Sequence, residues 1–172
     1  RLLGSGMIRA ATPSDIQGMV DVLRWGHQNS LYAHLTFNER EAARIVMACI
    51  SRHGKKNQAG TWVQVADKEG EVVGLIVGVL NRVYEVAEEM VASDVWWLAT
   101  PACGVRDRVG LMLSLRNWAQ RHPKCYELAV VASDVMGTAA AAEHVLAHMG
   151  LEKCGGIWRM DMTERRREVE AA

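Results

Sequence analysis

The residues most able to do chemistry lie where an apolar segment leads into a helix. Val91–Thr100 is largely apolar, and a segment rich in glycine and arginine follows it and ends at Gly110. We expect a helix from about Val109 to Arg121, with a loop before it. The first backbone N–H groups of a helix lack partners within the helix and carry partial positive charge. Such a junction favours a phosphate or pyrophosphate group, although an ordinary strand–loop–helix crossover has the same pattern.

Metal-binding and hydrolase patterns are weak or absent. The four cysteines are far apart and form no Cys-x-x-Cys pair, the spacing that zinc sites commonly use. His144 and His148 have the i, i+4 helical spacing that can bind a metal, but no acidic or cysteine side chain accompanies them at ligand spacing. The sequence contains neither a G-x-S-x-G motif nor a Walker loop. We therefore predict no metal site and no hydrolase triad.

Composition limits the partners. Lys+Arg and Asp+Glu are equal at 20 each, whereas nucleic-acid-binding domains usually carry a basic patch. No apolar run reaches the ~18 residues that a membrane-spanning helix needs. We predict no nucleic-acid or membrane partner. The scattered cysteines and the lack of a secretory signal favour a reducing, cytoplasmic location.

The pattern of apolar residues and turn signals predicts one domain with the order β-α-α-β-β-β-α-β-α-β. Thr12 and Pro13 have the residue types that begin a helix, and Asn38 can cap a second one. We interpret residues 1–6 as the remnant of an expression tag, residues 7–162 as the domain and residues 163–172 as a charged tail.

This order, together with the C-terminal half, resembles the GNAT family of acyl-CoA N-acyltransferases. Val145–Leu151, VLAHMGL, has the form of the segment that ends the fourth helix of that family, with Gly150 at its glycine. The resemblance covers about Met7 to Met162. It implies a single α/β (α+β) domain with a mixed central sheet of about six to seven strands, flanked by about four helices.

The resemblance implies acetyl-CoA as co-substrate. In the family, a Q/R-x-x-G-x-G/A loop after the fourth strand holds the CoA pyrophosphate on its backbone amides. Aligning its second glycine with Gly110 puts VRDRVG there, with Val105 at the Gln/Arg position and Arg108 at the first glycine. Arg108 either blocks close approach or pairs with a phosphate. The implied cofactor-binding residues are Leu98, Ala99 and Thr100 for the pantetheine arm, Val105, Arg106, Asp107, Arg108, Val109 and Gly110 for the pyrophosphate, and Ser133.

The resemblance also suggests a general base and an acceptor site. Asp94 has the spacing of a carboxylate that deprotonates the substrate amine in some relatives; a solvent-facing residue at the start of a strand is the alternative. His27, Tyr32 and His34 lie in a connection that walls the acceptor site in the family. An imidazole there can bind or deprotonate an amine, or these rings simply cover the core.

Two functional hypotheses follow. The first is an N-acetyltransferase that moves an acetyl group from acetyl-CoA to a primary amine by direct attack in a ternary complex. The acceptor is a small molecule, a peptide or a protein, and a homodimer is also expected from the resemblance. The second is an inactive GNAT-like binding or structural module, because Val105, Ala139 and Leu146 replace family signature residues. Leucine at position 146, where many relatives have tyrosine, cannot protonate the departing thiolate.

Overall fold

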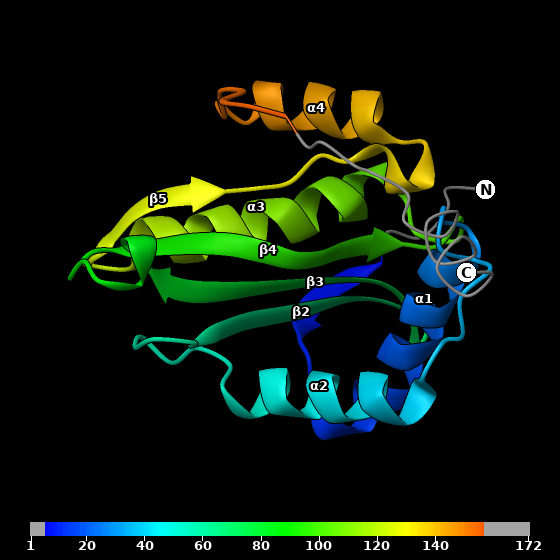
Figure 1. Cartoon of the computed structure of the whole chain (residues 1–172). Coiled ribbons are helices and arrows are strands. Elements are labelled where there is room, and N and C mark those ends of the chain that lie inside the picture. The colour runs from blue at the N-terminus through cyan, green and yellow to red at the C-terminus, as the bar shows by residue number, and fades with distance from the viewer. Residues whose placement is uncertain (1–5, 157–172) are drawn as a thin grey trace, which may run out of the picture.

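A five-stranded mixed sheet forms the centre of the protein in the computed structural model, which describes residues 6–156 (Figure 1). The first four strands pair antiparallel in chain order, and the fifth runs parallel to the fourth. A parallel neighbour requires a crossover connection, which a helix supplies here. The strands are β1 (Met7–Ala10), β2 (Thr61–Lys68), β3 (Glu71–Arg82), β4 (Met90–Ala99) and β5 (Cys125–Ala129).

In the described part of the chain, α-helices cover both faces of this sheet (Figure 1), and they number four. Alternate residues of a strand point to opposite faces, so each face has its own apolar cluster. Side chains of α1 and α2 pack with Val63 and Leu75 on one face. Side chains of α3 and α4 pack with Ile76 and Ala92 on the other. The helices are α1 (Ile16–Gln28), α2 (Glu39–Ser51), α3 (Val105–Arg121) and α4 (Ala139–His148).

The helix-start signals of the sequence are confirmed. Thr12 and Asp15 form a capping box before α1, and the Asn38 side chain accepts a hydrogen bond from the Glu41 N–H at the start of α2. Gly26, which has the residue type that ends a helix, lies instead within α1. A Cβ there would be 3.0 Å from Cδ1 of Leu98, so Gly26 lets α1 lie close to β4.

The α/β class, the four helices and the mixed sheet agree with the expected GNAT-like architecture. The structure describes five strands rather than six to seven. The closing strand predicted near residues 157–162, the tail at 163–172 and most of the supposed tag lie outside the described residues. Within residues 6–156, no helix is long and apolar enough to cross a membrane.

Candidate functional site

The sheet opens between β4 and β5. The two strands pair only from Met90 with Cys125 to Ser93 with Ala129, whereas β4 continues to Ala99. Among residues 6–156, no strand therefore pairs with β4 on its β5 side from Asp94 onward. Figure 1 shows the chain rising from the end of β5 toward α4. This open edge of β4, Asp94–Ala99, is the candidate site.

A β-bulge lies where the open edge begins. Asp94 pairs with Gly78 and Trp96 pairs with Val77, so Val95 is an extra residue in β4. A bulge bends its strand and increases the local twist. The bend coincides with the end of β4–β5 pairing, and we attribute the opening to it.

The carboxylate of Asp94 lies at the start of this opening. Its Oδ1 accepts a hydrogen bond from the Val131 N–H at 3.0 Å. Burial raises the pKa of Asp94 above its usual value, and the hydrogen bond from Val131 opposes this only in part. A carboxylate with a raised pKa is a stronger base than an exposed one. The geometry thus places a potential proton acceptor beside the open edge.

The three predicted pantetheine-binding residues differ in what they can offer. The N–H and hydroxyl of Thr100 both donate to the Val73 carbonyl, at 2.9 and 3.0 Å. Successive residues of an antiparallel strand alternate between facing the partner strand and facing away. Leu98 therefore directs its backbone polar groups toward β3, as the Thr100 N–H does, while Ala99 directs its own toward the open edge.

The start of α3 corrects the expected loop. The helix begins at Val105 rather than near Val109, and Gly104 is its N-cap. The N–H groups of Asp107 and Arg108 both donate to the Gly104 carbonyl, at 3.1 and 3.0 Å. VRDRV contains no helix breaker, and the acidic Asp107 is favourable at a positive helix end. The expected pyrophosphate loop is thus helical over Val105–Gly110.

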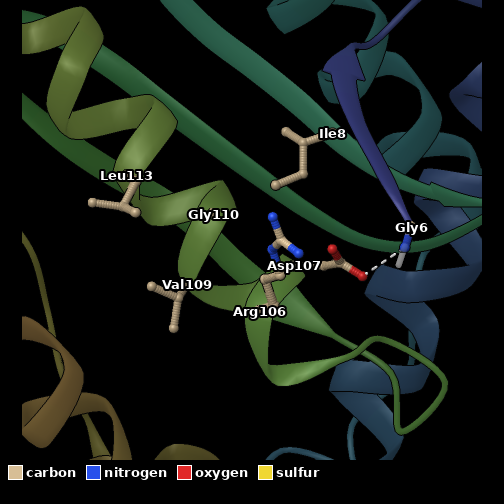
Figure 2. A pocket seen from close by; sticks show the side chains of 7 residues that line it. All are labelled: Gly6, Ile8, Arg106, Asp107, Val109, Gly110 and Leu113. Atoms are coloured by element: carbon tan, nitrogen blue, oxygen red, sulfur yellow. Dashed lines mark hydrogen bonds between the residues drawn. The ribbon is translucent and has the colours of Figure 1, made fainter. Parts of the chain in front are cut away.

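Gly110 lies in the second turn of α3, where it permits close packing. A Cβ at this position would be 2.4 Å from Cδ1 of Ile8 in β1. The buried Asp107 carboxylate accepts the Gly6 N–H at 2.9 Å, and Arg106 projects from the same side of α3 (Figure 2). These residues, with Val109 and Leu113, line a hollow of about 500 Å³ beside β1.

This hollow is distinct from the candidate site. β1 and β5 form the two opposite edges of the described sheet. Four predicted cofactor-binding residues, Arg106, Asp107, Val109 and Gly110, therefore line a hollow away from the β4–β5 opening. A role for them in cofactor binding stays a prediction.

Arg108 binds the turn that connects β4 to α3. Its Nε donates to the Cys103 carbonyl at 3.1 Å and its Nη2 to the Thr100 carbonyl at 3.0 Å. The Trp97 indole N–H in turn donates to the Arg108 carbonyl at 3.0 Å. The guanidinium is thus engaged within the protein. Sequence reasoning did not identify this contribution of Trp97.

Four backbone N–H groups remain at this turn. Within residues 6–156 no acceptor is found for those of Ala102, Gly104, Val105 and Arg106, and all four residues are exposed. Unpaired N–H groups at a helix start attract anions. The turn therefore offers donors that fit a phosphate group. Val105 and Arg106 belong to the segment that the alignment predicted, whereas Ala102 and Gly104 lie just before it.

The fourth helix offers no proton donor at the expected position. Leu146, which is 7% exposed, packs in the apolar cluster beneath α3 and α4. Ala139 is the first residue of α4. Ser133 is half-buried in the segment between β5 and α4, and no hydrogen bond of its side chain is found within residues 6–156. Its predicted contact with the cofactor stays a prediction.

The acceptor-site residues lie in and beside the α1–α2 connection. The His27 ring packs against Phe37 with ring centres 5.4 Å apart. Tyr32 and His34 are exposed. The Leu31 N–H donates to the Val135 carbonyl at 2.9 Å, which joins this connection to the segment that follows β5. His27 thus fits the core-covering interpretation, while Tyr32 and His34 are accessible.

The two histidines of α4 contact each other. Their ring centres lie 4.2 Å apart, and His148 Nδ1 is 2.8 Å from the His144 carbonyl oxygen. In the part of the chain from residue 6 to residue 156, no group of three His, Cys, Asp or Glu side chains is arranged to hold a metal ion.

Comparisons with known proteins identify the fold. No protein-family model and no curated protein matches the sequence. Solved structures do match, including an acetyltransferase from Trypanosoma brucei (TM-score 0.65, 17% identity, covering 90% of this chain and 98% of that one). A ribosomal-protein-alanine N-acetyltransferase from Brucella melitensis has a TM-score of 0.64 at 11% identity, covering 92% and 99% of the chains. Glucosamine-6-phosphate N-acetyltransferase from Arabidopsis thaliana gives 0.63 at 13% identity, with the same coverage. The chain has the GNAT acetyltransferase fold.

Proposed function

We propose that this protein is an N-acetyltransferase that moves an acetyl group from acetyl-CoA to a primary amine. The observation that carries the proposal is the juxtaposition of the open edge of β4 with the Asp94 carboxylate and the unpaired amides at the start of α3. The fold supports it, because solved acetyltransferases share this architecture at low sequence identity.

The acetyl donor would lie along β4. Backbone groups of Ala99 face the open edge and can pair with an amide of the pantetheine arm, as an added strand would. The N–H groups of Ala102, Gly104, Val105 and Arg106 would accept the pyrophosphate. The Asp107 carboxylate at the same helix end opposes anion binding.

Proton transfer to Asp94 would prepare the acceptor. An ammonium group cannot attack a carbonyl, so the amine first loses a proton to this carboxylate, directly or through a water. The neutral nitrogen then attacks the thioester carbon, a C–N bond forms, and the C–S bond breaks as the thiolate leaves. The amide nitrogen loses its second proton to water. Holding the amine against the thioester supplies much of the rate.

The departing thiolate would leave without help from α4. Leu146 is apolar and buried, so it cannot supply the proton that a tyrosine would. A thiol has an ordinary pKa of about 8.5, so the thiolate is a tolerable leaving group near neutral pH. We therefore expect slower chemistry than in a relative that has tyrosine there, and a rate that depends little on a second titrating group.

A binding titration and a turnover assay test the proposal. Acetyl-CoA that binds only the folded state stabilises it by about 2.7 kcal/mol at a hundredfold excess over Kd. We expect the melting temperature to rise with acetyl-CoA, and free thiol to be released when small amines or peptides are added. An unchanged melting temperature at millimolar acetyl-CoA would contradict the proposal.

The second candidate is a GNAT-like binding module without catalysis. The buried Leu146 and the helical Val105–Gly110 segment favour it, because both depart from the family's catalytic pattern. A rise in melting temperature with acetyl-CoA, together with no thiol release across a broad amine panel, would support this candidate over the enzyme.

A further inference from the structure

We infer that Arg108 is a positioning residue for the pyrophosphate, one that acts through the peptide bond between Cys103 and Gly104. This inference rests on the proposed function and assigns a specific role within the same site. Its basis is the pair of hydrogen bonds from the guanidinium to the Cys103 and Thr100 carbonyls, at 3.1 and 3.0 Å.

Because a peptide unit is planar, the contact between Arg108 and the Cys103 carbonyl also fixes the direction of the Gly104 N–H. In a trans peptide unit the C=O of one residue and the N–H of the next lie in one plane and point in opposite directions. The Cys103 carbonyl is directed at Arg108 Nε. The Gly104 N–H must therefore point away from the guanidinium, and it has no acceptor within residues 6–156.

The turn needs such a brace because its sequence leaves this peptide free to rotate. Glycine at position 104 has the widest choice of backbone angles, and the Gly104 side of the turn is exposed. Without Arg108 the Cys103–Gly104 peptide can turn over. A carbonyl oxygen would then face the anion in place of an N–H, which exchanges attraction for repulsion.

Two further contacts hold Arg108 and the turn in place. The Trp97 indole N–H donates to the Arg108 carbonyl at 3.0 Å, and the Cys103 N–H closes the turn onto the Thr100 carbonyl at 3.0 Å. A planar guanidinium can serve two carbonyls at once, which a lysine ammonium on a flexible stem does less well. The arginine at position 108, where the family has a glycine, thus braces the turn by bonding to two of its carbonyls.

The test separates pyrophosphate positioning from general damage to the fold. Titrations of CoA and of S-acetylpantetheine, which lacks the pyrophosphate and nucleotide, are compared for the wild type, R108M and R108K. R121M is the control, an exposed arginine at the other end of α3. We expect R108M to raise the Kd for CoA at least tenfold and that for S-acetylpantetheine less than twofold. R108K should be intermediate and R121M unchanged.

A second variant removes the donor itself. Gly104 has φ −66°, which suits proline, so G104P deletes the N–H while keeping this backbone angle. We expect G104P to weaken CoA in the same selective way as R108M. An equal loss for both ligands in R108M, or unchanged CoA binding in R108M or in G104P, overturns the inference. A wild type that binds neither ligand defeats the proposed function and this inference with it, whereas normal CoA binding in R108M defeats the inference alone.

Discussion

The Asp94 carboxylate and the Val131 amide are joined by a 3.0 Å hydrogen bond immediately beyond the last paired residues of β4 and β5. This bond spans the point at which the two strands part. It holds the acid at the entrance of the open edge rather than leaving it in solvent. Burial raises the pKa of Asp94 above its usual value, so the contact orients a carboxylate that is a stronger base than an exposed one.

Substitution of Asp94 by asparagine should remove the base while keeping the geometry, since the amide oxygen can still accept the Val131 N–H. We expect turnover at pH 7 to fall by about 10²-fold, the lower range for a general base. The loss should shrink toward the amine's own pKa, near 10, where the acceptor is neutral without help. The pH profile of D94N, compared with that of the exposed Asp21→Asn, checks this. Equal activity of D94N and the wild type at all pH values would remove Asp94 from the mechanism.

Substitution of Gly110 by alanine should affect packing and leave cofactor binding alone. The new methyl would meet Ile8 Cδ1 at 2.4 Å, so Ile8 must move. In an Ile8→Val background, which lacks that atom, alanine should stabilise the protein by up to about 1 kcal/mol through its helix propensity. Urea unfolding of I8V and I8V/G110A measures this difference. A tenfold loss of CoA affinity in I8V/G110A would instead indicate that Gly110 is part of the phosphate-binding site.

Placing tyrosine at position 146 should not restore a proton donor. Leu146 is 7% exposed and belongs to the apolar cluster, so a larger, polar ring overpacks it at a cost of about 1–3 kcal/mol. We expect L146Y to lower the melting temperature without raising the rate of thiol release. The volume-conserving L146M is the matched control. Faster turnover in L146Y with unchanged stability would mean that this side chain reaches the cleft.

Protonation of His53 should lower the free energy of unfolding at mildly acidic pH. Its Nδ1 accepts the Val63 N–H at 2.9 Å, and burial lowers its pKa below the usual value near 6.5. The unfolded chain then binds the proton first, so the stability is complete above about pH 6.5 and declines as the pH falls toward the folded pKa. The free energy of unfolding should fall more between pH 7.5 and 5.5 in the wild type than in H53Q.

The comparison with H53Q isolates the imidazole. Asp15, with a pKa of about 2 beside Arg9, stays ionised throughout that interval. Titration of Asp94 affects both proteins equally and cancels in the difference. Parallel pH dependences for the two proteins would show that protonation of His53 has no influence on folding.

Much of the fold is readable from local sequence, because the signals that specify it are local. The residue types at Thr12 and Asn38 indicate helix starts, because such side chains bond to backbone N–H groups of the next turn. Both caps are present in the structure. The strongly apolar run Glu71–Leu80 marks β3, and the order of elements suffices to suggest the GNAT architecture.

The boundary of α3 could not be read in the same way. A Gly- and Arg-rich segment is compatible with a loop or a helix, and the outcome depends on partners outside it. Arg108 binds carbonyls of the preceding turn, and Asp107 binds the N–H of Gly6, which is distant in sequence. The glycine at position 110 is explained by its close contact with Ile8 of β1, which is distant in the sequence. Only tertiary structure brings these residues together.

The same distinction between local sequence and tertiary structure applies to the candidate site. The sequence by itself determined that an acid precedes a strand–helix junction, because residue type and spacing are properties of the chain. Tertiary structure decided that this acid lies at an opening. That placement depends on the bulge at Val95, on the register of β3 against β4 and on the early end of β5 pairing. Strand register follows from packing across the whole sheet, and no single segment encodes it.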